Sequence, residues 1–402
     1  MTVSCASTAD KLLFPLKLIR VALLIVFFLL GAFSIVATQF IGIVINFLLT
    51  FLFSFLSNFL KLFNENQLDF LKNLKEIWLS FTKKLFIILL VSIMDAISPT
   101  NIKITYKYDS SLLPKDTFFT TNDTNDLISN INPFSIFIAN HQIYTDWVYL
   151  WFILYSGNLS NFIYIMLKDS LSKLLIFGWG MKNYNFIFLS RKWKTDKHTL
   201  LNSFNLLNFK SDKKNGNFPY SLVLFPEGTN YSDNRKVVSN NYCQKNNHPN
   251  MNNVLYPRIT GLRFTLRNLY KTSNYLYDFT IAYSDIKKNQ FPEKIYTLSN
   301  TYIHGNGPKQ VNLFLKIHEI NRIPGLNLNT PFESPEDELK HSKIFEEWLV
   351  KIWDEKDQLL ENFYENSSYI LNEKISDLNN TDQLKELNFA EKNNYKVSLL
   401  SQ

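Results

Sequence analysis

Hydrophobic residues dominate the start of the chain, where no charged residue lies between Arg20 and Lys61. As a single α-helix this stretch would extend about 60 Å, which is about twice the thickness of the hydrocarbon core of a bilayer. The length therefore predicts two membrane helices, at residues 16–36 and 39–60, joined by a tight turn near residues 37–39.

Lysine and arginine flank the apolar stretch on both sides. Lys11, Lys17 and Arg20 precede it, and several lysines follow it from Lys61 onward. Positively charged flanks stay on the cytosolic side of a membrane, so both ends of the predicted hairpin are expected in the cytosol. We assign residues 1–63 to this N-terminal membrane anchor, which either spans the bilayer or dips into its cytosolic leaflet.

A second apolar segment lies within residues 64–98, but Lys83 and Lys84 interrupt it. The uninterrupted run that remains is too short to cross a bilayer. Interfacial helices, or helices that pack on the domain that follows, are therefore expected here.

From residue 99 to 334 the pattern changes to short apolar runs separated by segments of helix length. Strands are expected at residues 102–106, 134–139, 162–167, 186–189, 222–225, 279–283 and 311–317. Helices are expected at residues 148–155, 170–177 and 195–207. This alternation predicts an α/β domain, with a mostly parallel β-sheet flanked by helices on both faces and preceded by the membrane hairpin.

The end of the chain changes character again. Apolar residues at Ile344, Trp348 and Ile352 recur with helical spacing among acidic residues and lysines, which predicts an amphipathic helix over residues 335–364. Residues 365–402 are rich in Asn, Glu and Lys, a composition typical of a poorly ordered tail.

The net charge of +7 is modest for 402 residues and is not gathered in a long basic block. Such a charge suits anionic lipid or anionic substrates, and the chain carries no aromatic-basic motif of a nucleic-acid reader. Cys5 and Cys243 lie in distant segments and predict no disulfide framework, which fits a domain in the reducing cytosol. A nucleophilic Cys243 assisted by His248 is an alternative, but the Asn-rich surroundings are typical of a surface loop.

A histidine and an aspartate follow the strand expected at residues 134–139. His141 and Asp146 are five residues apart, so on one continuous helix their side chains would lie about 140° apart. They can meet if His141 is on a loop and Asp146 is in the first turn of the next helix. Asp146 would then accept a hydrogen bond from one ring nitrogen and leave the other as a base. The alternative is a hydrogen bond that only starts the helix.

Three further runs follow expected strands or lie close to them. Glu227, Gly228 and Thr229 follow the strand at 222–225, and glycine allows backbone amides there to approach an oxyanion or phosphate. Arg191 follows another strand, and its planar guanidinium can pair with a phosphate through two hydrogen bonds. A strand-ending turn and a solvated surface arginine are the respective alternatives.

A fourth run places Arg258 beside Pro257 and close to Gly261. In this order and spacing the four runs resemble the glycerolipid acyltransferase family, whose motifs are NHxxxxD, a strand ending in arginine, FPEGT and a late proline-bearing block. The resemblance is greatest to the eukaryotic acyl-CoA:lysophospholipid acyltransferases that include lysocardiolipin and lysophosphatidylinositol acyltransferases. It rests on Asn140-His141, Asp146-Trp147, residues 177–181, Arg191 to Lys194, residues 225–229, residues 256–261 and the helix at 345–353.

The resemblance implies an acyl-CoA-dependent O-acyltransferase that acts on the free hydroxyl of a lysophospholipid, with a lysophosphatidylinositol-type substrate favoured. His141 would be the base and Asp146 its orienting partner. Arg191, Glu227 and Gly228 would lie near the glycerophosphate head. Strand-edge geometry makes the amides of Gly228 and Thr229 candidate oxyanion donors, and Arg258 would bind either phosphate. No permanently bound cofactor and no metal are expected, and acyl-CoA is a co-substrate.

Two alternatives remain at this point. One is a 1-acylglycerol-3-phosphate (lysophosphatidic acid) acyltransferase of new phospholipid synthesis, because headgroup choice depends on pocket shape and not on the shared motifs. The other is a non-catalytic membrane scaffold with the same fold. For the enzyme we expect an integral membrane protein of the endoplasmic reticulum with a cytosolic catalytic domain. The bilayer and the two substrates are the expected partners, without nucleic acid, and no protein partner can be inferred.

Overall fold

A computed structural model describes residues 8–60, 65–107, 119–121, 127–328, 332–367 and 384–388. Its centre is an eight-stranded sheet with the strand order β10-β1-β9-β8-β4-β7-β5-β6. The strands are β1 (Asn101–Lys107), β4 (Phe134–Ala139), β5 (Ile163–Lys168), β6 (Ile187–Leu189), β7 (Tyr220–Leu224), β8 (Tyr275–Tyr283), β9 (Gln310–Glu319) and β10 (Leu384–Asn388). A separate pair consists of β2 (Phe119–Thr121) and β3 (Leu127–Ser129).

Most neighbouring strands in this sheet are parallel. Strand β4 pairs in parallel with β7 and with β8, and β5 pairs in parallel with β7 and with β6. Strands β1 and β9 are parallel to each other but run against β8, and β10 pairs antiparallel with β1. The carboxyl ends of β4 to β8 therefore lie along one edge of the sheet.

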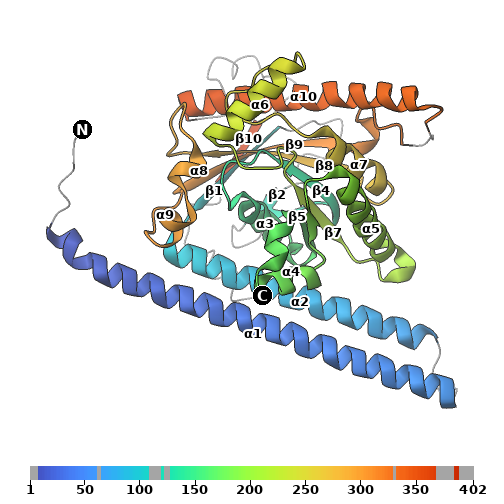
Figure 1. The fold of residues 1–402 in the computed structure, drawn as a ribbon. Coiled ribbons are helices and arrows are strands. Elements are labelled where there is room, and N and C mark those ends of the chain that lie inside the picture. Colours follow the sequence, from blue (N-terminus) through green and yellow to red (C-terminus); the bar gives the residue numbers. More distant parts are fainter. Residues whose placement is uncertain are drawn as a thin grey trace.

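Helices cover both faces of the sheet, as Figure 1 shows. One face packs against α2 (Glu65–Ile97), α3 (Asp146–Ser156) and α4 (Phe177–Asn183), and the other against α5 (Trp193–Ser211), α7 (Ile259–Leu269) and α10 (Pro335–Asn366). Phe137 and Ala139 of β4 join the first core, whereas Ile136 and Ile138 join the second. A strand buried on both faces is apolar throughout, which explains why the run at 134–139 shows no alternation. The predicted α/β fold is confirmed.

The seven strands expected from the sequence are all present, with shifted ends. The helix expected at 170–177 is wrong. A 3₁₀ turn at Asp169–Lys173 is followed by Leu174 in an extended conformation, and α4 begins only at Phe177. Gly178 lets α4 pack closely on this turn, because a Cβ there would lie 2.4 Å from the carbonyl oxygen of Ser172. A Cβ on Gly180 would lie 3.3 Å from Val36 of the N-terminal helix.

The N-terminal helices also differ from the expectation. Residues Thr8–Leu60 form one continuous helix, α1, so the turn expected at 37–39 is wrong. Residues 37–39 contain neither glycine nor proline to break the helix. The hydroxyls of Ser34 and Thr38 donate to carbonyls one turn earlier in the same helix, at 2.9 and 2.8 Å. The hairpin instead joins α1 to α2.

Small residues allow α1 and α2 to pack side by side (Figure 1). A Cβ on Gly42 would overlap Trp78 of α2, whose indole Nε1 donates to the carbonyl of Thr38 at 3.1 Å. Farther along, the side chain of Asn46 donates to the carbonyl of Leu71 at 2.7 Å. The two helices therefore form a single apolar unit with few polar contacts.

Helix α2 is also fixed to the α/β domain. Buried Lys83 donates to the carbonyl of Ile163, at the start of β5, at 2.8 Å. Lys210 of α5 forms an ion pair with Glu76 of α2 at 2.6 Å. These contacts hold α2 against the side of the sheet, so α1 is the outer helix of the pair.

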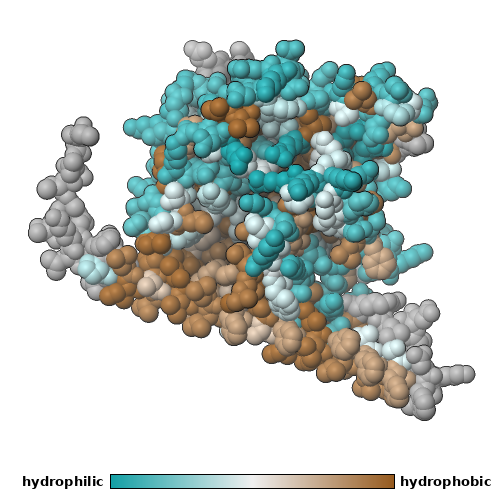
Figure 2. Space-filling view, in the orientation of Figure 1, coloured by the Kyte–Doolittle hydropathy of each residue, from teal (hydrophilic) through white to brown (hydrophobic). Residues whose placement is uncertain are grey.

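The outer surface of α1 is strongly apolar. Its exposed large side chains include Leu23, Phe27, Leu30, Phe47 and Phe51, the last two at 67% and 66% exposure. Figure 2 shows them as a continuous hydrophobic band along the molecule, below a largely hydrophilic domain. Segments Leu18–Leu56 and Asn73–Ile97 are both long and apolar enough to cross a membrane. This surface indicates membrane association.

Helix α10 begins after Ser334, whose hydroxyl accepts a hydrogen bond from the amide of Asp337 at 3.1 Å. An N-cap of this kind is worth about 1 kcal/mol. Beyond the helix, the tail was expected to be poorly ordered, but β10 pairs with β1 at the edge of the sheet. The exposed backbone of an edge strand offers such a partner a row of hydrogen bonds. The rest of the tail lies outside the described residues.

Candidate active site

The structure brings His141 and Asp146 together at the carboxyl end of β4. Strand β4 ends at Ala139 and α3 begins at Asp146, so the histidine is on the connecting loop. His141 Nδ1 lies 2.8 Å from Asp146 Oδ2, with the histidine side chain 17% exposed and the aspartate side chain completely buried. Because Nδ1 faces the carboxylate, Nε2 is the ring nitrogen that can accept a proton.

The Asp146 carboxylate is the centre of a dense set of donors. Oδ2 also accepts from the backbone amides of Gln142 at 2.5 Å and Ile143 at 3.0 Å. Oδ1 accepts from the hydroxyl of Tyr283 at the end of β8. Burial, and then the nearby Asp146, raises the pKa of Tyr283. The hydroxyl therefore stays protonated and donates a hydrogen bond to Asp146. The position of Asp146 in the first turn of α3 adds the favourable field of the helix dipole.

The histidine ring is held from the other side as well. It stacks on Phe225 with ring centroids 4.3 Å apart and planes inclined by 21°. The His141 carbonyl accepts from the amide of Tyr231 at 2.7 Å. The preceding Asn140 bonds both backbone groups of Ile281 in β8, at 3.0 and 2.7 Å. The loop is therefore fixed to the strands on both sides of β4 before any substrate arrives.

The turn after β7 lies next to the histidine. Gly228 has a φ of +72°, a conformation that L-residues with a Cβ rarely adopt. A Cβ there would also lie 3.0 Å from Nε of Arg258, so the glycine lets this guanidinium pack over the turn. The Gly228 amide donates to the carbonyl of Phe225 at 2.9 Å. Of the two backbone amides that were candidate oxyanion donors, that of Gly228 is therefore already hydrogen-bonded within the turn. The amide of Thr229 is the remaining candidate.

The Glu227 side chain faces the interior, not the exposed edge. It is 3% exposed, and its Oε1 accepts from the indole of Trp353 in α10 at 3.3 Å. Burial raises the pKa of Glu227 well above 4.5, against the opposing hydrogen bonds of Trp353 and of the amides of Leu255 and His141. The Glu227 carboxyl thus contacts Trp353 and the backbone of the histidine loop, and its role near the headgroup stays a prediction.

Three arginines gather near the Gly228 turn. Arg191 follows β6, Arg258 caps α7, and Arg235 belongs to α6 (Asp233–Lys245), and all three side chains are exposed. Desolvation, followed by the charges of Arg258 and Arg235, lowers the pKa of Arg191. Within the part of the chain that the structure describes, none of the three has an acidic partner at ion-pair distance. Such a cluster of unpaired guanidiniums is suited to phosphate.

Arg191 is held in an unusual backbone conformation, with a φ of +66°. The preceding Ser190 stabilises it, because the Ser190 amide and hydroxyl both donate to Asp196 Oδ1, at 2.8 and 2.7 Å. Strain of this kind persists only where the surrounding contacts determine it. Arg235 was missed by the sequence reasoning, since it belongs to no motif and the helix that carries it showed no apolar pattern.

The alternative of a nucleophilic Cys243 receives no support from the structure. The Cys243 side chain is buried, and burial raises the pKa of its thiol. No group of three or more His, Cys, Asp or Glu side chains could hold a metal ion within the residues searched.

Comparison with known proteins agrees with this site. A family model described as Acyltransferase matches residues 124–284. The chain is 38% identical to a 2-acyl-1-lysophosphatidylinositol acyltransferase of Saccharomyces cerevisiae over 323 residues, which is 74% of this chain and 77% of that protein. It is 32% identical to lysocardiolipin acyltransferase 1 of Gallus gallus over 58% of this chain and 54% of that protein.

A third relative, named "Probable 1-acyl-sn-glycerol-3-phosphate acyltransferase 5" in Arabidopsis thaliana, is 32% identical over 58% of this chain and 54% of that protein. The chain therefore belongs to the acyltransferase family. It is an enzyme of acyl transfer within the lysophospholipid branch that the four motif-bearing runs predicted, and that prediction is confirmed.

Glu227→Gln tests the interior role of this carboxyl. Because the pKa of Glu227 is raised, this carboxyl binds its proton more tightly in the folded protein than in the unfolded chain. The stability that the protonated carboxyl contributes is present below pH 4.5 and is lost as pH rises through the folded pKa. Glutamine still accepts from Trp353 and carries no charge. Thermal unfolding followed from about pH 5 to about pH 8 should show the variant at least as stable as wild type at the upper end. Lower stability there would mean that the folded protein needs the charge.

Proposed function

We propose that this chain transfers a fatty acyl group from acyl-CoA to the free hydroxyl of a lysophospholipid, with a lysophosphatidylinositol-type acceptor favoured. The observation that carries the proposal is the preformed pair of His141 and Asp146 at an edge shared with three exposed arginines that have no acidic partner among the described residues. A relative that covers most of both chains is named for 2-acyl-1-lysophosphatidylinositol, which supports the choice of acceptor.

In the proposed reaction, His141 Nε2 takes the proton of the lipid hydroxyl while the hydroxyl oxygen attacks the thioester carbonyl. A C–O bond forms, and the carbonyl oxygen becomes a tetrahedral oxyanion. Asp146 keeps the proton of the ring on Nδ1 and stabilises the imidazolium. The C–S bond then breaks, the thiolate of CoA leaves, and the proton on Nε2 neutralises it. The transfer is direct, without an acyl-enzyme.

The surrounding residues have proposed roles that follow from their positions. The Thr229 amide is the candidate donor to the oxyanion, because the neighbouring Gly228 amide is already bonded within its turn. Arg191 and Arg258, joined by Arg235, bind phosphate, which both the lysophospholipid and CoA carry. The protein requires no permanently bound cofactor, since the thioester itself supplies the activated acyl group.

We also propose that α1 and α2 lie along the cytosolic face of the membrane and that neither helix crosses it. Helix α2 is fixed to the domain at several points along its length, including Glu76 and Lys83, so it cannot leave the domain to enter the bilayer alone. Helix α1 packs along α2 and turns its apolar surface outward (Figure 2). Immersion of that surface in one leaflet would satisfy it. The endoplasmic reticulum fits this enzyme class.

A position on the cytosolic face of the membrane would give the domain direct access to its lipid substrates. Both lipid substrates have acyl chains in the bilayer and reacting groups at its surface. A domain held at the interface can therefore receive them without extracting them into water. This arrangement places the acyl acceptor and the catalytic pair at the same boundary between lipid and cytosol.

His141→Ala tests the proposed base. Loss of general base catalysis should lower acyl transfer by a factor of about 10² to 10⁴, while membrane association stays as in wild type because α1 and α2 are untouched. The measurement is transfer of a labelled acyl group from acyl-CoA by the purified protein in vesicles. Transfer at the wild-type rate would rule out the role assigned to His141.

The same assay separates the acceptors. Wild-type protein is given one labelled acyl-CoA with lysophosphatidylinositol, lysophosphatidic acid or lysocardiolipin in turn. The proposal expects the highest kcat/KM with lysophosphatidylinositol. A preference for lysophosphatidic acid would instead support the 1-acylglycerol-3-phosphate acyltransferase alternative, and no transfer to any acceptor would support a scaffold.

Cysteine labelling tests whether α1 lies along one face of the membrane or crosses it. In a Cys5→Ser background, Arg20→Cys and Ser57→Cys place single thiols near the two ends of α1, while Cys243 stays buried. If α1 lies along one face, a membrane-impermeant maleimide should reach both positions in sealed microsomes. Labelling of position 57 only after detergent would show that α1 crosses the bilayer.

A further inference from the structure

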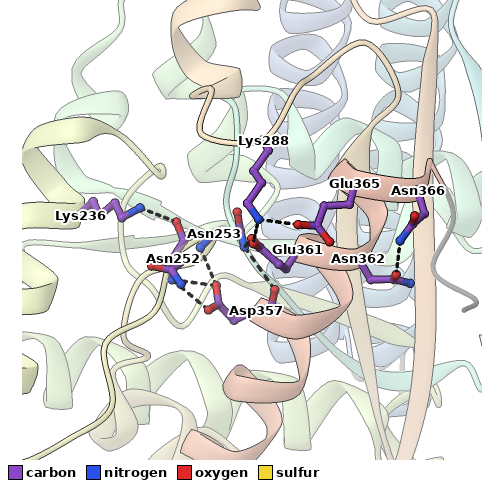
Figure 3. A network of polar contacts seen from close by, with 9 residues as sticks. All are labelled: Lys236, Asn252, Asn253, Lys288, Asp357, Glu361, Asn362, Glu365 and Asn366. Atoms are coloured by element: carbon purple, nitrogen blue, oxygen red, sulfur yellow. Dashed lines mark hydrogen bonds and ion pairs between the residues drawn. The ribbon is translucent and has the colours of Figure 1, made fainter.

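A buried carboxylate on α10 connects that helix to the catalytic loop. Asp357 is 9% exposed and faces the turn at residues 252–253, as Figure 3 shows. Its oxygens accept hydrogen bonds from the backbone amide of Asn252 at 3.0 and 2.9 Å and from the backbone amide of Asn253 at 2.5 Å. The side chain of Asn253 then donates to Glu361, one turn farther along α10, at 3.0 Å. One carboxylate thereby fixes two successive peptide groups.

The two carbonyls of the same turn point toward the catalytic loop. The Asn253 carbonyl accepts from Gln142 Nε2 at 2.9 Å, and the Asn252 carbonyl accepts from the hydroxyl of Tyr231. Gln142 is completely buried, and its backbone amide donates to the Asp146 carboxylate. Tyr231 donates its own amide to the carbonyl of His141. The turn therefore holds one partner of His141 and one of Asp146.

A charged acceptor suits this position. Two neighbouring amides converge on one largely buried side chain, and a carboxylate offers lone pairs to both. Burial raises the pKa of Asp357, while the amides of Asn252 and Asn253 oppose that shift. Lys236 and Lys288 lie at the rim of the network, where they bond Asn252 and Glu361 respectively.

We propose that Asp357 is a positioning residue for acyl transfer: it fixes the 252–253 turn, and through Gln142 and Tyr231 it fixes the orientation of the His141–Asp146 pair. This inference rests on the function proposed above. Asp357 is linked to His141 and Asp146 through the 252–253 turn, Gln142 and Tyr231, so we expect its effect on the chemical step. Small misplacements of a catalytic group can lower a rate by about 10².

The central test is Asp357→Asn, which keeps the shape of the side chain but turns one acceptor into a donor that faces an amide. We expect kcat to fall by about tenfold to a hundredfold with KM unchanged for acyl-CoA and for lysophosphatidylinositol. Asp354→Asn is the matched control, because it makes the same change one turn earlier, where Asp354 accepts from Gln358 of the same helix at 2.7 Å. The control should leave kcat unchanged.

A second variant approaches the same link from the other side. Gln142→Met keeps an unbranched side chain of similar size but removes the Nε2 donor to Asn253. If Asp357 acts through Gln142, the double variant should lose much less activity than the product of the two single losses. This comparison stays informative if Asp357→Asn lowers stability, and hydrogen exchange of the peptide covering residues 140–147 reports the loop directly, with faster exchange expected in Asp357→Asn.

The outcomes separate the two proposals. Wild-type protein that transfers no acyl group to any lysophospholipid would contradict the proposed function itself. Active wild type with an unchanged kcat in Asp357→Asn, or losses that multiply fully in the double variant, would overturn the positioning role alone. A rise in KM with unchanged kcat would also overturn it, because that result would assign Asp357 to substrate binding.

Discussion

The fully satisfied carboxylate of Asp146 is the interaction on which the rest of the site depends. An unpaired buried carboxylate is very costly, so this one persists only because the His141 ring, two backbone amides and the hydroxyl of Tyr283 all donate to it. Each hydrogen bond to such a charge contributes about 2 kcal/mol. The same bonds that stabilise the charge fix the loop, the start of α3 and the histidine tautomer. Folding stability and catalytic geometry therefore rest on one group.

The sheet supplies these donors in the right places. Strand β8 is the neighbour of β4, so Tyr283 and Ile281 lie beside the histidine loop although they are far away in sequence. On the other side, β7 delivers Phe225 and the Gly228 turn. Helix α10 closes the arrangement from the second face of the sheet through Trp353 and Asp357. The proposed catalytic pair is thus supported from β7, β8 and α10, while Arg191, Arg235 and Arg258 have no acidic partner at ion-pair distance among the described residues.

Much of this could be predicted from the sequence, and the failures have physical causes. Strands buried on both faces can be recognised in the sequence as apolar runs. The residues that follow parallel strands lie at one edge of the sheet, so the sequence correctly predicted that His141, Arg191 and the Gly228 turn share that edge. Tyr283 and Asp357 could not be found, because their roles arise from strand pairing and helix packing between distant segments. The single long α1 was missed because the stretch was divided by bilayer thickness, whereas the structure shows α1 packed along α2, which is fixed to the domain.

A double-mutant cycle on the catalytic pair tests this account most directly, by measuring kcat/KM for acyl transfer in His141→Ala, Asp146→Asn and the combined variant. If Asp146 acts through the histidine ring, the combined variant should be no less active than His141→Ala within about threefold. Losses that multiply would show that the two residues act independently. That result would contradict the claim that one buried carboxylate organises the catalytic base.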